Sequence, residues 1–171
     1  MIWLESSLQT LYQSAVDAFP GTTKRQHATH EIKIANVQWI PFVGMKTLFV
    51  KGRALHEERE YSPTIVFKKV QYAEEKARKI VALKASDGKT YFLERLSIED
   101  TDVLVRCSCG DFRWRFSYYN HLDKSLQGPK AKKYTPVPGS NRPPANPMEA
   151  AGLCKHIMKL GKVLSESTIL V

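Results

Sequence analysis

The first twenty residues place apolar side chains at helical spacing. The apolar positions are Leu4, Leu8, Leu11, Ala15 and Phe19. Residues that recur every three or four positions lie on one face of a helix, and Pro20-Gly21 ends the pattern. The sequence therefore predicts an amphipathic helix over residues 4–19, followed by a polar loop over residues 22–30.

From residue 31 the pattern changes to β-branched and aromatic residues with a period of two, which is typical of half-buried strands. The segments with this character are 32–39, 47–50, 64–72, 80–85, 91–96, 102–109 and 112–119. We expect Pro41 to interrupt the first strand. Asp87-Gly88 predicts a hairpin, because glycine readily adopts a positive φ. The last two segments are expected to pair, with Gly110 at the bend.

The segment 128–147 has a different composition. It contains six of the nine prolines, no acidic residue and four basic residues. These are Lys130, Lys132, Lys133 and Arg142. Proline lacks an amide donor and fixes φ, so this segment is predicted to be an extended loop. A short helix is expected from Leu153, with Ile157, Leu160 and Leu164 on one stripe.

These elements predict an α+β fold with an N-terminal helix, a mainly antiparallel sheet and a C-terminal helix. We divide the chain into 1–100, the helix and sheet region, and 101–171, which carries a long insert at about 120–147. At 171 residues the two parts are expected to form one compact unit.

The composition favours some classes of function and excludes others. A formal net charge of +9 favours an anionic partner such as nucleic acid, or a phosphate-rich assembly. No apolar run is long enough to predict a membrane span. The first residues lack the basic and apolar regions of a secretory signal, so we expect a reducing compartment and no secretion.

The three cysteines fall in two tight groups, Cys107-Ser108-Cys109 and Cys154-Lys155-His156. Zinc takes four tetrahedral thiolate and imidazole ligands, so these residues predict one structural Zn²⁺ site without an open position. On a strand, Cys107 and Cys109 would face the same side. Cys154 and His156 can bind one ion only if Cys154 precedes the helix, a junction that Gly152 permits.

Two other interpretations of these residues remain open. The cysteines can simply be buried and inert, since free cysteine is among the most buried residue types. Alternatively, His121, twelve residues after Cys109, can supply the fourth ligand in place of His156.

Aromatic and basic residues alternate in the segment 112–119. As a strand it would turn Phe112, Trp114, Phe116 and Tyr118 toward the core and Arg113 and Arg115 outward. With Lys130, Lys132, Lys133 and Arg142, these arginines form a candidate surface for nucleic-acid phosphates. The plainer interpretation is a half-buried strand with solubilising arginines beside a solvated loop.

The stretches RCSCGDF (106–112) and GLCKHIMKL (152–160) resemble the two halves of a SWIM-type zinc finger. The resemblance places its ligands on Cys107, Cys109, Cys154 and His156, in a ββα module, and implies binding to DNA or protein. One departure is the 44 residues between Cys109 and Cys154, which exceed the usual separation in that family.

The stretches DFRWRFSYYNHLDKS (111–125), NPMEAAGLCKH (146–156) and TTKRQHATH (22–30) resemble small proteins of T-even-like tailed phages of marine cyanobacteria. This resemblance implies a virion structural or assembly protein, located in the virion or the host cytoplasm, that docks on other virion proteins. The alternative is a nucleic-acid-binding zinc protein. The sequence has no glycine-rich phosphate loop, nucleophile elbow or H-E-x-x-H motif, so we expect neither an enzyme nor a small-molecule substrate.

Overall fold

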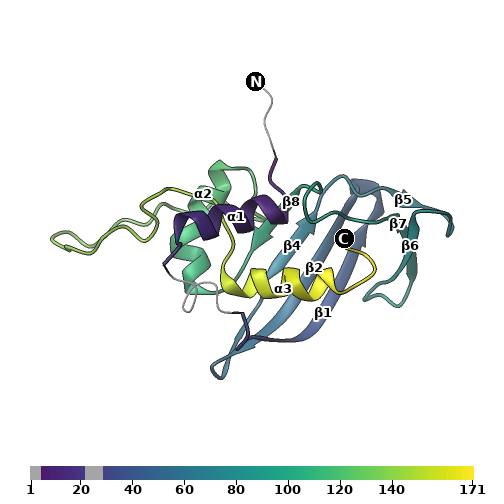
Figure 1. Cartoon of the computed structure of the whole chain (residues 1–171), viewed down its shortest axis with the longest axis horizontal. Coiled ribbons are helices and arrows are strands. Elements are labelled where there is room, and N and C mark those ends of the chain that lie inside the picture. The colour runs from purple at the N-terminus through teal and green to yellow at the C-terminus, as the bar shows by residue number, and fades with distance from the viewer. Residues whose placement is uncertain (1–4, 22–28) are drawn as a thin grey trace.

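Two antiparallel sheets and a small set of helices form the described part of the chain, residues 5–21 and 29–171, in this computed structural model (Figure 1). The α+β class is confirmed. Leu4 and residues 22–28 of the predicted polar loop lie outside the described residues. The elements are α1 (Leu8–Ala18), β1 (Lys33–Phe42), η1 (Val43–Met45), β2 (Thr47–His56), β3 (Arg59–Tyr61), β4 (Thr64–Phe67), β5 (Tyr72–Ala73), β6 (Ile80–Lys84), β7 (Thr90–Glu94), β8 (Val103–Arg106), η2 (Phe112–Phe116), α2 (Ser117–Leu122) and α3 (Lys155–Ser165).

The larger sheet is built around β2. Its strand order is β1-β2-β4-β8, with β3 paired to β2, and every pairing is antiparallel. Along β2 buried residues alternate with more exposed ones, as expected for a strand with one face on the core. The sheet joins residues of both predicted parts of the chain, because β8 pairs with β4.

Pro41 does not end the first strand, contrary to the sequence prediction. β1 continues to Phe42, and Pro41 lies opposite Leu48 of β2. Among the described residues β1 pairs with no strand other than β2, so it is an edge strand of the sheet. Proline is tolerated on such an edge strand, which is why the pattern continues through it.

The smaller sheet has the order β5-β7-β6 and contains the predicted hairpin. Gly88 adopts a φ of 82° in the turn, and the Asp87 side chain accepts a hydrogen bond from the Lys89 amide at 2.8 Å. The Asp-Gly hairpin is therefore confirmed. The predicted strand 64–72 is divided, since Thr64–Phe67 joins the large sheet and Tyr72 the small one.

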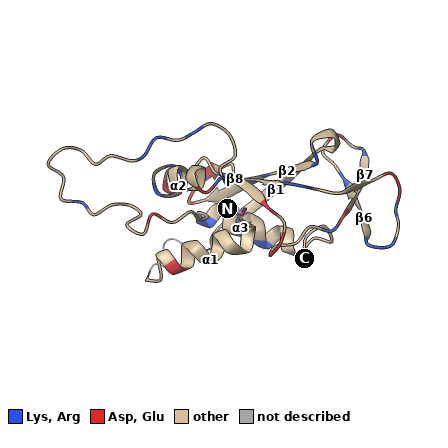
Figure 2. Cartoon of the chain, turned by 90° about the horizontal axis from the view of Figure 1, so that it is seen from above, with Lys and Arg blue, Asp and Glu red and all other residues tan. Residues whose placement is uncertain are grey.

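Helices α1 and α3 lie on the same side of the large sheet (Figure 2). Ser7 caps α1 through a capping box with Thr10, so the helix begins at Leu8 rather than at Leu4. The predicted apolar stripe of α3 is buried. Gly52 of β2 allows this helix close to the sheet, because a Cβ there would lie 3.0 Å from Leu160 Cδ1.

The segment 112–119 is helical, so its prediction as a strand is wrong. Residues Phe112–Phe116 form a π-type turn that continues directly into α2. The buried residues Phe112, Phe116 and Asn120 recur every four positions, which is a helical spacing. Phe116 packs edge-on against Phe19, with ring centroids 5.8 Å apart. Trp114, predicted to face the core, is instead 49% exposed.

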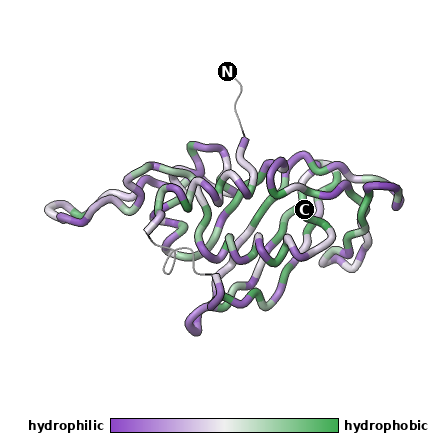
Figure 3. The backbone as a smooth tube through the Cα atoms, viewed as in Figure 1, coloured by the Kyte–Doolittle hydropathy of each residue, from purple (hydrophilic) through white to green (hydrophobic). Residues whose placement is uncertain are grey.

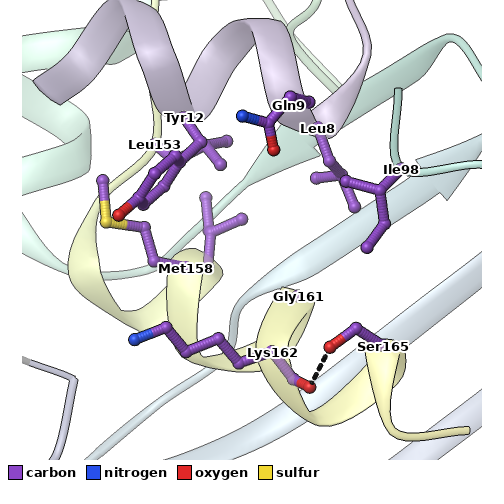
Figure 4. A pocket seen from close by; sticks show the side chains of 10 residues that line it. Leu8, Gln9, Tyr12, Ile98, Leu153, Met158, Gly161, Lys162 and Ser165 are labelled. Carbon is purple, nitrogen blue, oxygen red and sulfur yellow. Dashed lines mark hydrogen bonds between the residues drawn. The ribbon is translucent and has the colours of Figure 1, made fainter. Parts of the chain in front are cut away.

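An apolar cavity of about 210 Å³ lies between α1 and α3 (Figure 4). Leu8 and Tyr12 of α1 face Met158 of α3 across it, with Leu153 beside them. None of the residues predicted to bind metal or phosphate lines this cavity. In the part of the chain that the structure describes, no helix combines the length and hydropathy required to cross a membrane.

Candidate metal centre

The two predicted pairs of ligands meet at one buried point. Their ligand atoms, three Sγ atoms and one imidazole nitrogen, all lie within 4.8 Å of one another. Cys107 follows the last residue of β8, and Cys154 immediately precedes α3. All four side chains are buried, so the centre is closed to solvent. The four residues are Cys107, Cys109, Cys154 and His156.

The second pair adopts the arrangement that the sequence required. Cys154 is the N-cap of α3, with an extended backbone (φ −76°, ψ 166°), and His156 is in the first turn. Cys154 thus precedes the helix, and both side chains reach the same point. His121, the alternative fourth ligand, lies on α2 and is not part of the cluster.

The first pair reaches the centre by a different route from the predicted one. The strand β8 ends at Arg106, so Cys107 and Cys109 lie in the turn after it and not on the strand. The Phe112 amide donates a hydrogen bond to Cys109 Sγ at 3.3 Å. The start of the helical segment therefore fixes the position of Cys109.

The chain approaching Cys154 is held by a buried amide. Asn120 of α2 donates to the Gly152 carbonyl at 3.0 Å and accepts from the Gly152 amide at 2.8 Å. Gly152 itself has no room for a side chain, because a Cβ would lie 2.7 Å from Phe116 Cε1. Gly152 is needed here for close packing rather than only for the backbone junction that the sequence suggested.

The pKa values of the three thiols show how many of them can be charged together when no cation lies among them. Hydrogen bonds from the Cys107 and Cys154 thiols lower the pKa of Cys109, so the cluster stabilises one thiolate. Burial raises the pKa of Cys154, and burial and its neighbours oppose a second charge there. Three buried thiolates are compatible only with a positive ion among them, and a divalent metal supplies that charge.

The surroundings of His156 leave a ring nitrogen free to bind a metal. Both ring nitrogens are buried, and neither has a hydrogen-bond partner. Tyr61 packs over the imidazole, with ring centroids 4.2 Å apart. Because a buried polar atom without a partner is costly, the free nitrogen facing the thiols fits a metal bond. The donor set is compatible with a metal ion such as zinc.

Several of the predicted phosphate-binding residues lie together beside this centre. Arg113, Lys130 and Lys132 line a cavity of about 740 Å³, which we call the basic groove. Arg106 and Trp114 line it as well, and Cys107 lies at its metal-centre side. No sequence pattern indicated Arg106, and the strand prediction placed Trp114 in the core.

Arg115 is placed differently from the other predicted basic residues. Its Nε lies 2.9 Å from the Asp111 carboxylate, and its guanidinium lies over the Phe19 ring at 4.6 Å. The side chain is only 18% exposed. Burial raises the pKa of Asp111, which the neighbouring Arg115 opposes. These contacts favour a packing role for Arg115.

We call residues 128–147 the arm, which projects from the body of the molecule (Figure 1). It contains no helix or strand, as predicted, and residues 132–144 are all exposed. Lys133 lines a second, aromatic cavity at its base, and Arg142 is exposed on the arm and lines neither cavity. Figure 3 shows that the projecting tube is largely hydrophilic.

Both ends of the arm are fixed by hydrogen bonds. Arg106 Nη2 donates to the Pro129 carbonyl at 2.6 Å where the arm leaves the body. Asn146 donates to the Arg115 carbonyl at 2.9 Å and to the Ala150 carbonyl at 2.8 Å where it returns. The bonds from Arg106 to Pro129 and from Asn146 to Arg115 join residues far apart in the chain, which the sequence pattern does not reveal.

Comparisons of the chain with protein families, with curated proteins and with solved structures found no match. The assignment of the metal centre therefore rests on its geometry.

Proposed function

We propose that this chain is a structural or assembly protein of a tailed-phage virion, which uses a structural zinc centre to present the arm to other virion proteins. The observation that carries the proposal is that the metal cluster joins both ends of residues 110–153. The arm lies within that segment. A bound Zn²⁺ would cross-link the two ends of this segment. The cross-link would lower the conformational entropy of the unfolded chain and so favour the folded state.

Residues at the base of the arm would hold it in position, and exposed residues farther along would contact the partner. Arg106 and Asn146 hold the two limbs of the arm at its base. Beyond them, Val137 is 74% exposed and is flanked by prolines. Proline restricts the backbone before binding, so less conformational entropy is lost when such a segment docks.

We assign the centre to the SWIM type as part of the same proposal. The order of ligands, C-x-C followed by C-x-H at the start of a helix, supports this assignment. The segment after the first pair is helical where a ββα module would have its second strand. The chain would thus be a variant of that module with a long inserted arm.

Cross-linking of purified particles tests the docking role. In particles of the phage that encodes the chain, we expect the protein to be present and Lys132 or Lys133 to cross-link to another virion protein. Replacing residues 134–144 with a Gly-Ser linker keeps both lysines and should still abolish these cross-links, while zinc content is unchanged. Absence of the chain from purified particles would overturn the proposal.

A second candidate function is nucleic-acid binding, and a specific observation favours it. Among the described residues, the side chains lining the basic groove include four cations and no acidic group. Such a surface attracts phosphates and gives an affinity that falls with salt. Binding at low salt that is weakened on replacing Arg113, Lys130 and Lys132 by Gln would support this function, and no binding at low salt would reject it.

A further inference from the structure

We infer that the basic groove and the adjoining aromatic cavity form one site for single-stranded nucleic acid, with phosphates along the groove and an unpaired base against Trp114. This inference rests on the second candidate function and narrows its ligand. Two cavities that share one aromatic side chain carry it.

The groove provides the charge for a phosphate backbone. Arg106 and Arg113 from the body line the same cavity as Lys130 and Lys132 from the arm. Arg106 Nη2 is held by the Pro129 carbonyl, which fixes one wall of the groove. Lysines and arginines that follow a groove are the usual means of holding a single strand without reading its sequence.

The aromatic cavity provides a surface for a base. It has a volume of about 200 Å³ and is lined by Trp114, Tyr118, Tyr119 and Tyr134, with prolines of the arm. Trp114 and Tyr134 meet edge to face, with ring centroids 5.6 Å apart. Glu149 also lines this cavity, and its carboxylate would repel a phosphate. We therefore assign the cavity to an uncharged base.

Trp114 connects the two cavities. It lines both of them and is half exposed, although large aromatic side chains are usually mostly buried. The Arg113 guanidinium lies 4.7 Å from the centre of the indole ring. A cation and a stacking surface thus occur within the reach of one nucleotide.

The aromatic side chain distinguishes single strands from duplexes. In a duplex the bases are paired and stacked on one another, so their faces cannot stack on a tryptophan, and the cations of the groove are left with the phosphates. An unpaired base can stack on a tryptophan, which adds affinity for any sequence. We therefore expect the site to prefer single strands, whereas the cations alone would bind both forms.

Fluorescence anisotropy of the full-length, zinc-loaded chain tests the inference. The probes are a fluorescein-labelled, mixed-sequence single strand and its duplex, each titrated at several salt concentrations. We expect the single strand to bind at least about 5-fold more tightly than the duplex, and Trp114→Leu to remove that difference. Phe42→Leu, at another exposed aromatic residue, is the matched control and should preserve it.

The charge of the groove is tested separately. Replacing Arg113, Lys130 and Lys132 by Gln should lower the slope of log affinity against log salt by about 2 for the single strand. The control variant replaces three exposed lysines in and around the small sheet by Gln, namely Lys76, Lys84 and Lys89. It should leave the salt slope nearly unchanged.

The outcomes separate this inference from the function on which it rests. Equal binding of both probes, unchanged by Trp114→Leu, would overturn the single-strand site and leave phosphate binding intact. No binding of either probe at low salt would overturn nucleic-acid binding altogether. Circular dichroism and zinc content of each variant establish that it is folded.

Discussion

Asn120 holds Gly152 by two hydrogen bonds, although 32 residues separate them in the chain. The side chain is fully buried, and it joins α2 to the segment that leads to Cys154. One candidate metal ligand is therefore positioned by a residue that is not itself in the cluster. Such outer contacts orient ligands and increase the affinity for the metal.

Asn120→Ala should weaken both the fold and the metal centre. The substitution leaves the Gly152 amide and carbonyl buried without partners, which costs about 1–3 kcal/mol. We expect a lower free energy of unfolding in urea and a weaker zinc affinity in a competition with a coloured chelator. Asn36→Ala, at an exposed position of β1, is the control. Equal zinc affinity in the two variants would refute the positioning role of Asn120.

Two glycines close together in the sequence should respond in opposite ways to alanine. At Gly152 a Cβ would lie 2.7 Å from Phe116 and 2.9 Å from Ala15, so Gly152→Ala should cost about 1–3 kcal/mol through overpacking. At Gly161, inside α3, a Cβ would meet nothing within 4 Å. Gly161→Ala should instead stabilise the protein by about 0.5–1 kcal/mol, because alanine favours the helix. Thermal unfolding measures both changes, and a loss of stability at Gly161 would contradict the packing described here.

Glu5 should contribute to stability in a defined pH range. Hydrogen bonds with Asp102, Lys69 and Lys68 lower its pKa from 4.5 to about 2. Because the folded-state pKa is the lower one, the contribution is present above about pH 4.5 and is lost as the pH falls toward 2. Burial raises the pKa of Asp102, which acts in the opposite sense.

The difference between the wild-type chain and Glu5→Gln isolates this contribution, since acid affects the metal ligands of both proteins alike. We expect the wild type to be more stable at pH 6 in urea unfolding, and the difference to shrink below about pH 4.5. A difference in stability that stays constant over this pH range would show that the partners of Glu5 do not lower its pKa.

The sequence predicted the cluster of three cysteines and one histidine better than the elements around it. Cys154 and His156 could be placed because helical geometry allows only one arrangement in which both bind one ion. The strand prediction for 112–119 is wrong because the aromatic residues of this segment fit a period of two and also a spacing of four. The helical conformation is favoured because it buries Phe112 and Phe116 together in the core.

The surroundings of the site depend on contacts between residues distant in the sequence. The helix brings Asp111 and Arg115 together at a spacing of four, so Arg115 turns inward where a strand would have exposed it. Arg106 lines the groove because β8 ends beside the arm. No periodicity in the sequence shows which side chains these contacts will place together.

The metal content of the purified chain tests the central claim most directly. Mass spectrometry of the native protein and elemental analysis should find one zinc ion per chain, lost in Cys154→Ser and retained in His121→Ala. Because zinc-binding energy acts as folding energy, Cys154→Ser should also destabilise the C-terminal third of the chain. A chain without metal when purified in the presence of zinc, or a Cys154→Ser variant with normal zinc content and melting, would contradict the four-ligand centre.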